Sequence, residues 1–127
     1  MKERRAHPRV NEEAEVAVKI LSAPENHTLE NRLFAGLTTD ISAGGLRLSS
    51  DAPLSVGGLV EMNVTCTHPS RILRHIGRVV WVKKTGNRSQ AYEIGVKFTE
   101  TPEATLAAWT EILRDKLSRA GGAAPPA

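Results

Sequence analysis

The chain has 127 residues and a mass of 13.8 kDa, which is enough for one compact domain and leaves no room for a second. Its 40% hydrophobic and 24% charged residues are ordinary for a globular protein, and an aromatic share of 4% leaves the core to valine, isoleucine and leucine. The net charge of +3 lies entirely in the first nine residues, since residues 10–127 hold equal numbers of basic and acidic groups. This balance argues against a binder of long nucleic acids, which spreads positive charge over a face.

The cysteine content and the hydropathy of the chain exclude further classes of protein. A single cysteine, Cys66, excludes an internal disulfide and a cysteine-based zinc cluster. No apolar run approaches the roughly 20 residues that a membrane span needs. The N-terminal region also lacks the apolar core of a secretory signal. We therefore expect a cytoplasmic protein without membrane insertion.

Residues 1–12 are expected to form a flexible basic arm. Its first nine residues hold four basic side chains against one acidic side chain, namely Lys2, Arg4, Arg5 and Arg9 against Glu3. Pro8 disfavours a helix at this point, so the arm should be extended. Guanidinium groups on an extended segment suit a phosphate or the O6 and N7 edge of guanine. On its own, the arm is better explained as a solvated tail that aids solubility.

Residues 13–100 carry the alternation of apolar and polar residues that is typical of half-buried strands. Turn-forming residues divide this region into short segments, and no helical pattern interrupts them. The expected strands are 14–21, 32–41, 45–49, 59–66, 72–84 and 92–98. Six successive short strands predict a mainly-β fold, a small six-stranded antiparallel barrel.

Residues 101–120 predict one amphipathic helix. Thr101 can cap it, and Pro102 suits its first position. Apolar residues recur at three- and four-residue spacing as Leu106, Trp109, Leu113 and Leu117. We expect this stripe to cover one opening of the barrel. The pair Gly121-Gly122 should end the helix and leave residues 121–127 disordered.

A second polar segment follows the second expected strand and reads Asp40-Ile41-Ser42-Ala43-Gly44-Gly45. Asp40 can accept hydrogen bonds from the N1 and N2 donors of guanine. Ser42 can hold either the turn or a ligand. The two glycines, Gly44 and Gly45, allow the backbone to approach a flat ligand closely.

Taken together, the arm and this polar segment resemble the two signature motifs of the PilZ family of cyclic di-GMP receptors. The RxxxR motif matches Arg5 to Arg9, and the [D/N]xSxxG motif matches Asp40 to Gly45. The later segments 77–81 and 95–98 are also similar to that family. The resemblance covers about residues 4–98 and implies a PilZ-type barrel with a C-terminal α-helix.

The same resemblance implies a ligand site for cyclic di-GMP between the arm and the barrel. Arg5 and Arg9 would contact phosphate and guanine. Four residues of the second motif would surround a guanine: Asp40, Ser42, Gly44 and Gly45. Arg4, immediately before the first motif, favours binding of two stacked ligand molecules by one protomer.

The function implied is that of a single-domain cyclic di-GMP receptor or adaptor. Its arm would order on the ligand and alter the surface that a downstream protein meets, and so regulate motility, biofilm or polysaccharide output. The alternative is a PilZ-fold protein-interaction module that acts independently of cyclic di-GMP. Nucleic acid is disfavoured as a partner, because the few aromatic residues form no basic stacking platform. We expect a monomer or a weak homodimer.

The other reactive residues are expected to be structural. The four histidines lack the spacing of metal ligands, and no nucleophile has a partnering base, so we expect neither a metal nor an enzyme. Cys66 should be a buried small hydrophobe. Trp81 is expected to pack against the C-terminal helix, with contact to the ligand as the alternative. Arg47 is expected to be a solvated side chain, although it could also reach the ligand.

Overall fold

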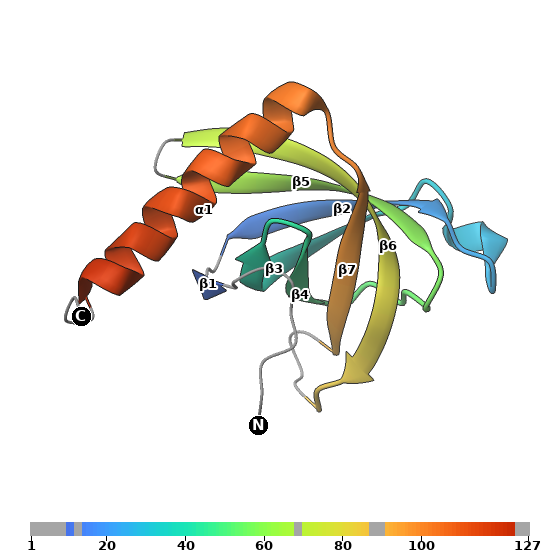
Figure 1. Ribbon diagram of the computed structural model, residues 1–127. Helices are drawn as coiled ribbons and strands as arrows, with labels where there is room; N and C mark the ends of the chain where they lie inside the picture. Colours follow the sequence, from blue (N-terminus) through green and yellow to red (C-terminus); the bar gives the residue numbers. More distant parts are fainter. Residues whose placement is uncertain (1–9, 12–13, 68–69, 87–90, 124–127) are drawn as a thin grey trace.

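The computed structural model describes residues 10–11, 14–67, 70–86 and 91–123, and for residues 10–11, 67 and 116–123 it describes the backbone only (Figure 1). Predictions made for the arm at 1–9, including Arg4, Arg5 and Arg9, and for residues 124–127 fall outside this part of the chain.

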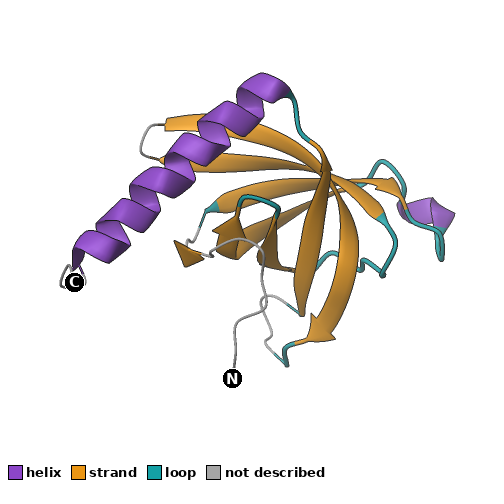
Figure 2. Ribbon diagram, in the orientation of Figure 1, coloured by secondary structure: helices purple, strands orange, loops and turns teal. Residues whose placement is uncertain are grey.

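Six antiparallel strands close into a barrel (Figures 1 and 2), in the order β3-β2-β5-β6-β7-β4, with β4 pairing back onto β3. They are β2 (Glu15–Ser22), β3 (Leu33–Ser42), β4 (Gly45–Ser50), β5 (Leu59–Thr67), β6 (Ser70–Lys84) and β7 (Tyr92–Glu100). The predicted six-stranded antiparallel barrel is confirmed. Every expected strand begins and ends within two residues of the observed one, because turn residues and the alternating pattern agree along this region.

A further strand of two residues, β1 (Val10–Asn11), extends the sheet beside β3. The flexible arm expected over residues 1–12 is therefore wrong for these two residues. The reason lies in the neighbouring strand: β2 pairs with only the first half of β3, up to Leu37. The second half of β3 keeps an open edge on that side, and backbone groups on an open edge take a partner where the chain offers one.

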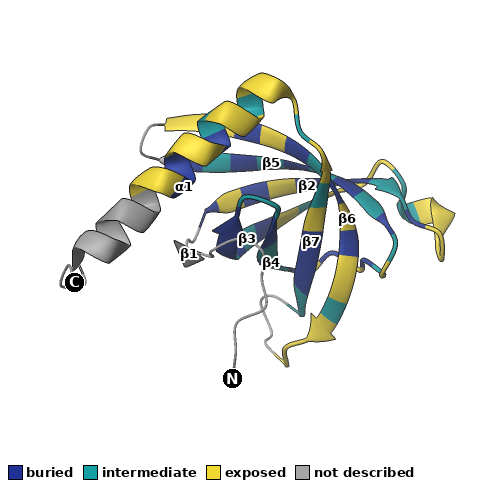
Figure 3. Cartoon of the chain, viewed as in Figure 1, coloured by how far each residue is buried: buried dark blue, intermediate teal, exposed yellow. Residues whose placement is uncertain are grey.

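The interior of the barrel is filled mainly by aliphatic side chains at alternate strand positions, as Figure 3 shows by the dark bands that recur along each strand. The strand residues at most 3% exposed include Val16, Val18, Ile20, Leu46, Leu48, Val60, Met62, Val64, Val79, Ile94 and Val96. Cys66 is also buried, as predicted. Burial of such side chains stabilises the fold by about 1.5–3 kcal/mol each.

The C-terminal helix α1 (Glu103–Ala123) lies obliquely across one end of the barrel (Figure 1), where it contacts β6 and β1. It buries Trp109, Ile112 and Leu113 against the core. The predicted stripe is wrong for Leu106, which is 43% exposed, since the helix meets the barrel one turn later. A 3-10 turn, η1 (His27–Leu29), links β2 to β3. No helix in the described ranges is both long and apolar enough to cross a membrane.

The end of α1 differs from the expectation. The helix continues through Gly121 and Gly122 to Ala123, whereas the glycine pair was expected to end it at residue 120. Glycine weakens a helix by about 1 kcal/mol but keeps its backbone donor and acceptor, so a pair of glycines lowers helix stability without forcing a stop.

Candidate functional site

The chain segment that follows the first motif lies directly against the second motif. β1 pairs antiparallel with β3 so that Val10 is opposite Ile41 and Asn11 is opposite Asp40. Arg9 lies outside the described residues, but the residue next to it in the chain is fixed opposite the centre of the second motif. Backbone pairing therefore brings the two residues that follow the first motif to the second motif.

A β-bulge sets the direction of Asp40. The pairing of β3 with β4 shifts register between Thr38 and Asp40, which leaves Thr39 as the extra residue. Thr38 is fully buried, and Asp40 is paired with Arg47, which lies between the inward Leu46 and Leu48. The bulge thus turns Asp40 to the outer face of the barrel, on the same side as Arg47.

Asp40 forms an ion pair with Arg47 on the neighbouring strand. The Arg47 Nη2 atom lies 2.7 Å from Asp40 Oδ2, and Arg47 Nε donates to Thr39 Oγ1 at 3.1 Å. The Asp40 side chain is 5% exposed, whereas that of Arg47 is 34% exposed. The expectation that Arg47 is a freely solvated residue is therefore wrong, because the bulge places a carboxylate beside it.

Ser42 holds the turn of the second motif. Its hydroxyl donates to the Gly45 carbonyl at 3.2 Å, and its own carbonyl accepts a buried hydrogen bond from Trp109 Nε1 at 2.8 Å. Of the two roles left open for Ser42, the structure supports the turn. The second contact also ties the motif to helix α1, which the sequence did not suggest.

Gly45 and Gly44 bring β4 and β7 close together. A Cβ added at Gly45 would lie only 2.3 Å from the Val96 carbonyl oxygen, so a larger residue would push the two strands apart. The Gly44 carbonyl accepts a hydrogen bond from the Phe98 backbone at 2.8 Å. Strand packing is thus a sufficient physical reason for glycine at position 45, whatever the ligand requires.

A row of residues runs across the outer face from β3 to β6, and β1 lies beside its first member. The strand pairings align Asn11 with Asp40, Asp40 with Arg47, Arg47 with Gly95 and Gly95 with Trp81. The Trp81 ring lies over Gly95, where an added Cβ would be 2.2 Å from its Nε1 atom. The ring is 37% exposed. A carboxylate, a guanidinium and an aromatic surface therefore stand side by side on three strands.

Trp81 does not occupy the place that was expected for it. Among the described residues, the ring contacts of the helix are those of Trp109 with His75 and Phe98, at centroid distances of 4.4 and 5.6 Å. Trp81 lies instead over β7, in the outer row. The alternative, a tryptophan that faces the ligand region, fits this position.

His75 is buried beneath helix α1, where its ring contacts Trp109, the residue that is hydrogen-bonded to Ser42 of the second motif. Its ring stacks on Phe98 at 4.0 Å, and its Nδ1 atom lies 2.9 Å from Thr101 Oγ1. Burial lowers the pKa of His75 from 6.5 to about 4. In the described ranges no group of three potential metal-ligating side chains comes together.

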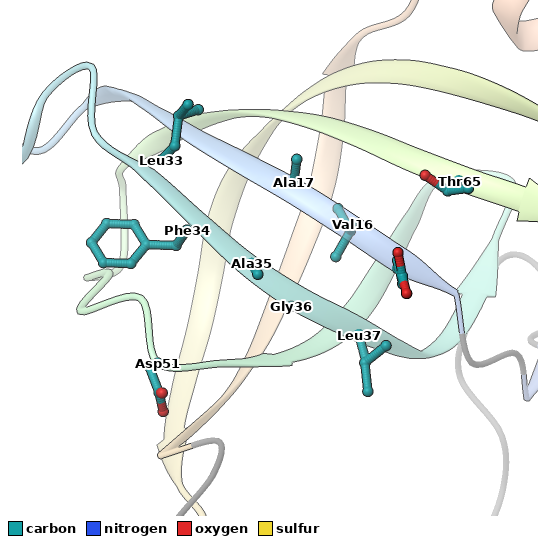
Figure 4. A pocket seen from close by; sticks show the side chains of 10 residues that line it. Val16, Ala17, Leu33, Phe34, Ala35, Gly36, Leu37, Asp51 and Thr65 are labelled. Atoms are coloured by element: carbon teal, nitrogen blue, oxygen red, sulfur yellow. The ribbon is translucent and has the colours of Figure 1, made fainter.

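A groove lies elsewhere, along the outer faces of β2 and β3 (Figure 4). Its volume is about 730 Å³, and its lining contains none of Asp40, Ser42 and Gly45. Its carboxylates are those of Glu15 and Asp51 and its aromatic ring is that of Phe34, but none of the described residues that line it carries a guanidinium. We therefore place the candidate site on the row beside β1.

Comparison with known proteins agrees with this geometry. The family model described as PilZ domain matches residues 3–114. No curated protein matches the sequence significantly. Among solved structures, the PilZ domain of Escherichia coli YcgR with c-di-GMP is similar, with a TM-score of 0.70 and 12% identity over 98% of this chain and 100% of that one.

Two longer proteins share the same fold. Bacillus subtilis inhibitor of motility (MotI/DgrA) gives a TM-score of 0.68 at 18% identity over 92% of this chain. The K. pneumonia MrkH–c-di-GMP complex gives 0.65 at 22% identity over 94% of this chain. The present chain spans only 53% of the first protein and 55% of the second.

Proposed function

The chain belongs to the PilZ domain family, and from this premise we propose that it is a receptor for cyclic di-GMP. The ligand would bind between the N-terminal arm and the outer row that contains Asp40, Arg47 and Trp81. Similar solved structures include PilZ proteins in complex with c-di-GMP, which supports the choice of ligand.

The observation that carries this proposal is the pairing of β1 with β3. It holds Val10, the residue after Arg9, opposite Ile41, between Asp40 and Ser42. Arginines from the arm and a carboxylate from the barrel can then meet one ligand from two sides. A guanine offers O6 and N7 to a guanidinium and the N1 and N2 donors to a carboxylate, so this pair of groups reads both edges of the base.

Charge explains how binding would change the shape of the molecule. Arg4, Arg5 and Arg9 repel one another when no anion is present, and a ligand with two phosphates neutralises them. Binding would order the arm over the outer row and present a new surface to a downstream protein. That protein, and with it the output in motility, biofilm or polysaccharide production, can be sought by affinity capture with and without cyclic di-GMP.

Calorimetric titration of the purified protein with cyclic di-GMP tests the proposal. We expect saturable binding, and an Arg9→Ala variant should lose about 1.5–3 kcal/mol, or roughly ten- to over a hundredfold in affinity. Arg32→Ala is the matched control, because Arg32 lies beyond the opposite end of β3 and covers the Phe34 ring. Absence of binding at tens of micromolar ligand, or equal losses in the two variants, would contradict the proposal.

We also propose that one protomer binds two stacked ligand molecules. The position of Arg4 motivates this ratio, and the exposed Trp81 ring offers a stacking surface at the far end of the row. The same titration should give two ligand molecules per protomer, and Arg4→Ala should reduce this number to one. A ratio of one in the unmodified protein would reject the second ligand and leave the first unaffected.

A further inference from the structure

β3 is apolar on both of its faces in its first half. Leu33, Ala35 and Leu37 alternate with Phe34 and Gly36, which pack toward the interior. A strand that borders water on one side normally carries polar residues there. The outer side of this half is instead apolar, and Leu33 is 70% exposed.

β2 continues this surface in register. Glu15 is paired with Leu37, Ala17 with Ala35, and Lys19 with Leu33. The surface therefore has two alanines at its centre, an acidic residue with a leucine at one end, and a basic residue with a leucine at the other. Figure 4 shows the groove that runs along these two strands. We call these six residues the β2–β3 face.

In the described part of the chain, Glu15 and Lys19 take part in none of the ion pairs. They lie at opposite ends of the face, on either side of Ala17. The face is thus complementary in charge to a copy of itself that has been reversed along the strand direction.

We propose that the β2–β3 face binds the same face of a second copy of this chain. A two-fold axis that lies between the two sheets, crosses the strands and passes through the alanine pair would reverse one copy relative to the other. Glu15 of each copy would then face Lys19 of the other. Leu33 would enter the groove beside the partner's Leu37. The central alanines would let the two sheets approach closely.

The size of the face indicates how strong this association should be. A stable interface buries about 800 Å² on each partner, and six residues on two strands supply only part of that area. The two ion pairs at the rim add little to the affinity, because exposed ion pairs are screened by water and salt. We therefore expect a weak dimer with a dissociation constant on the order of micromolar or above.

Sedimentation equilibrium of the ligand-free protein over a range of concentrations tests the proposal, and its outcome is independent of cyclic di-GMP binding. The unmodified protein should show a monomer–dimer equilibrium. Glu15→Lys and Lys19→Glu should each weaken it several-fold, because each places like charges opposite one another. An equimolar mixture of these two variants should recover the association, since each supplies the charge that the other requires.

The double variant Glu15→Lys/Lys19→Glu should also recover dimerisation, and Glu111→Lys, an exposed helix residue, is the control for net charge. Ala35→Arg should abolish the dimer by filling the centre of the face, with circular dichroism confirming the fold. A protein that stays monomeric at hundreds of micromolar would overturn the proposal. So would single variants that dimerise like the unmodified protein, or a mixture that fails to associate.

Discussion

The two halves of β3 present opposite chemistry to the solvent although they belong to one strand. The first half, Leu33 to Leu37, is apolar on its outer side and is flanked by an alanine on β2. The second half carries Asp40 and Ser42 and is flanked by β1 and Arg47. The β-bulge at Thr39 lies between them.

This difference shows how one short barrel can separate two binding tasks. The bulge changes which side chains face outward, so that in our two proposals the polar half would meet a charged ligand and the apolar half would meet a second copy of the chain. The polar half is also held in place by contacts with other elements. Trp109 donates a hydrogen bond to the Ser42 carbonyl, and the Phe98 backbone donates one to the Gly44 carbonyl. Variants that act on one half should leave the other unchanged.

The largest effect is expected from the tryptophan that supports the polar half. Trp109→Ala should lower the free energy of unfolding by about 3–5 kcal/mol, because it removes a fully buried ring and its hydrogen bond to Ser42. Trp81→Ala is the matched control. Its ring lies on the surface of the row, so stability should fall by less than about 1 kcal/mol while cyclic di-GMP affinity decreases. Urea unfolding and calorimetry separate the two effects, and equal loss of stability would refute the distinction.

The free energy of unfolding should also depend on pH through His75, which packs against Trp109. Its pKa falls from 6.5 to about 4 on folding, so the unfolded chain binds the proton more tightly than the folded protein does. Stability should therefore decline as the pH falls below 6.5 and level off below pH 4, by about 3 kcal/mol in total. His75→Phe keeps an aromatic ring against Phe98 and removes this proton.

Comparing the unmodified protein with His75→Phe isolates the contribution of His75 to the pH dependence of stability. The free energy of unfolding should fall more steeply between pH 7 and 4.5 in the unmodified protein than in the variant. Since His75 packs on Trp109, acid should weaken the support of the polar half first. Parallel pH profiles would show that the proton is not bound at this residue.

A smaller effect is expected from the carboxylate of the polar half. Asp40→Asn keeps the shape of the side chain but removes the charge that pairs with Arg47, and it should reduce cyclic di-GMP affinity by roughly tenfold or more. Glu93→Gln is the control, because Glu93 lies 4.0 Å from the same guanidinium on the side away from β3. The control should bind almost normally. If the two variants lose affinity equally, the ligand does not approach from the β1 side.

The sequence predicted the elements well because their signals are local. Alternating Val16, Val18 and Ile20 mark one strand without reference to any other, and the same holds for the turns. The barrel followed from the number and spacing of such strands. The pair of polar motifs also stood out as short, contiguous patterns.

The relations between strands could not be predicted in the same way. The partner of Arg47 depends on a bulge that shifts the register of β3 by one residue, and no local pattern marks it. The place of Trp81 depends on a second register shift in β6, between Val79 and Trp81. The hydrogen bond from Trp109 to Ser42 joins residues 67 positions apart. His75 could have been recognised as inward-facing from its phase with Leu73 and Val79, but its partners could not.

The smallest effect is expected in the apolar half, and it tests whether the two tasks are separate. Leu33→Ser should change the free energy of unfolding by no more than about 0.5 kcal/mol at protein concentrations where the chain is monomeric, because the side chain is 70% exposed. Leu48→Ser, by contrast, should cost several times more, since Leu48 is fully buried. Cyclic di-GMP affinity should be unchanged in Leu33→Ser, while self-association at high concentration should weaken because a leucine is lost from the groove. Reduced ligand affinity in this variant would mean that the two halves of β3 are coupled across the bulge.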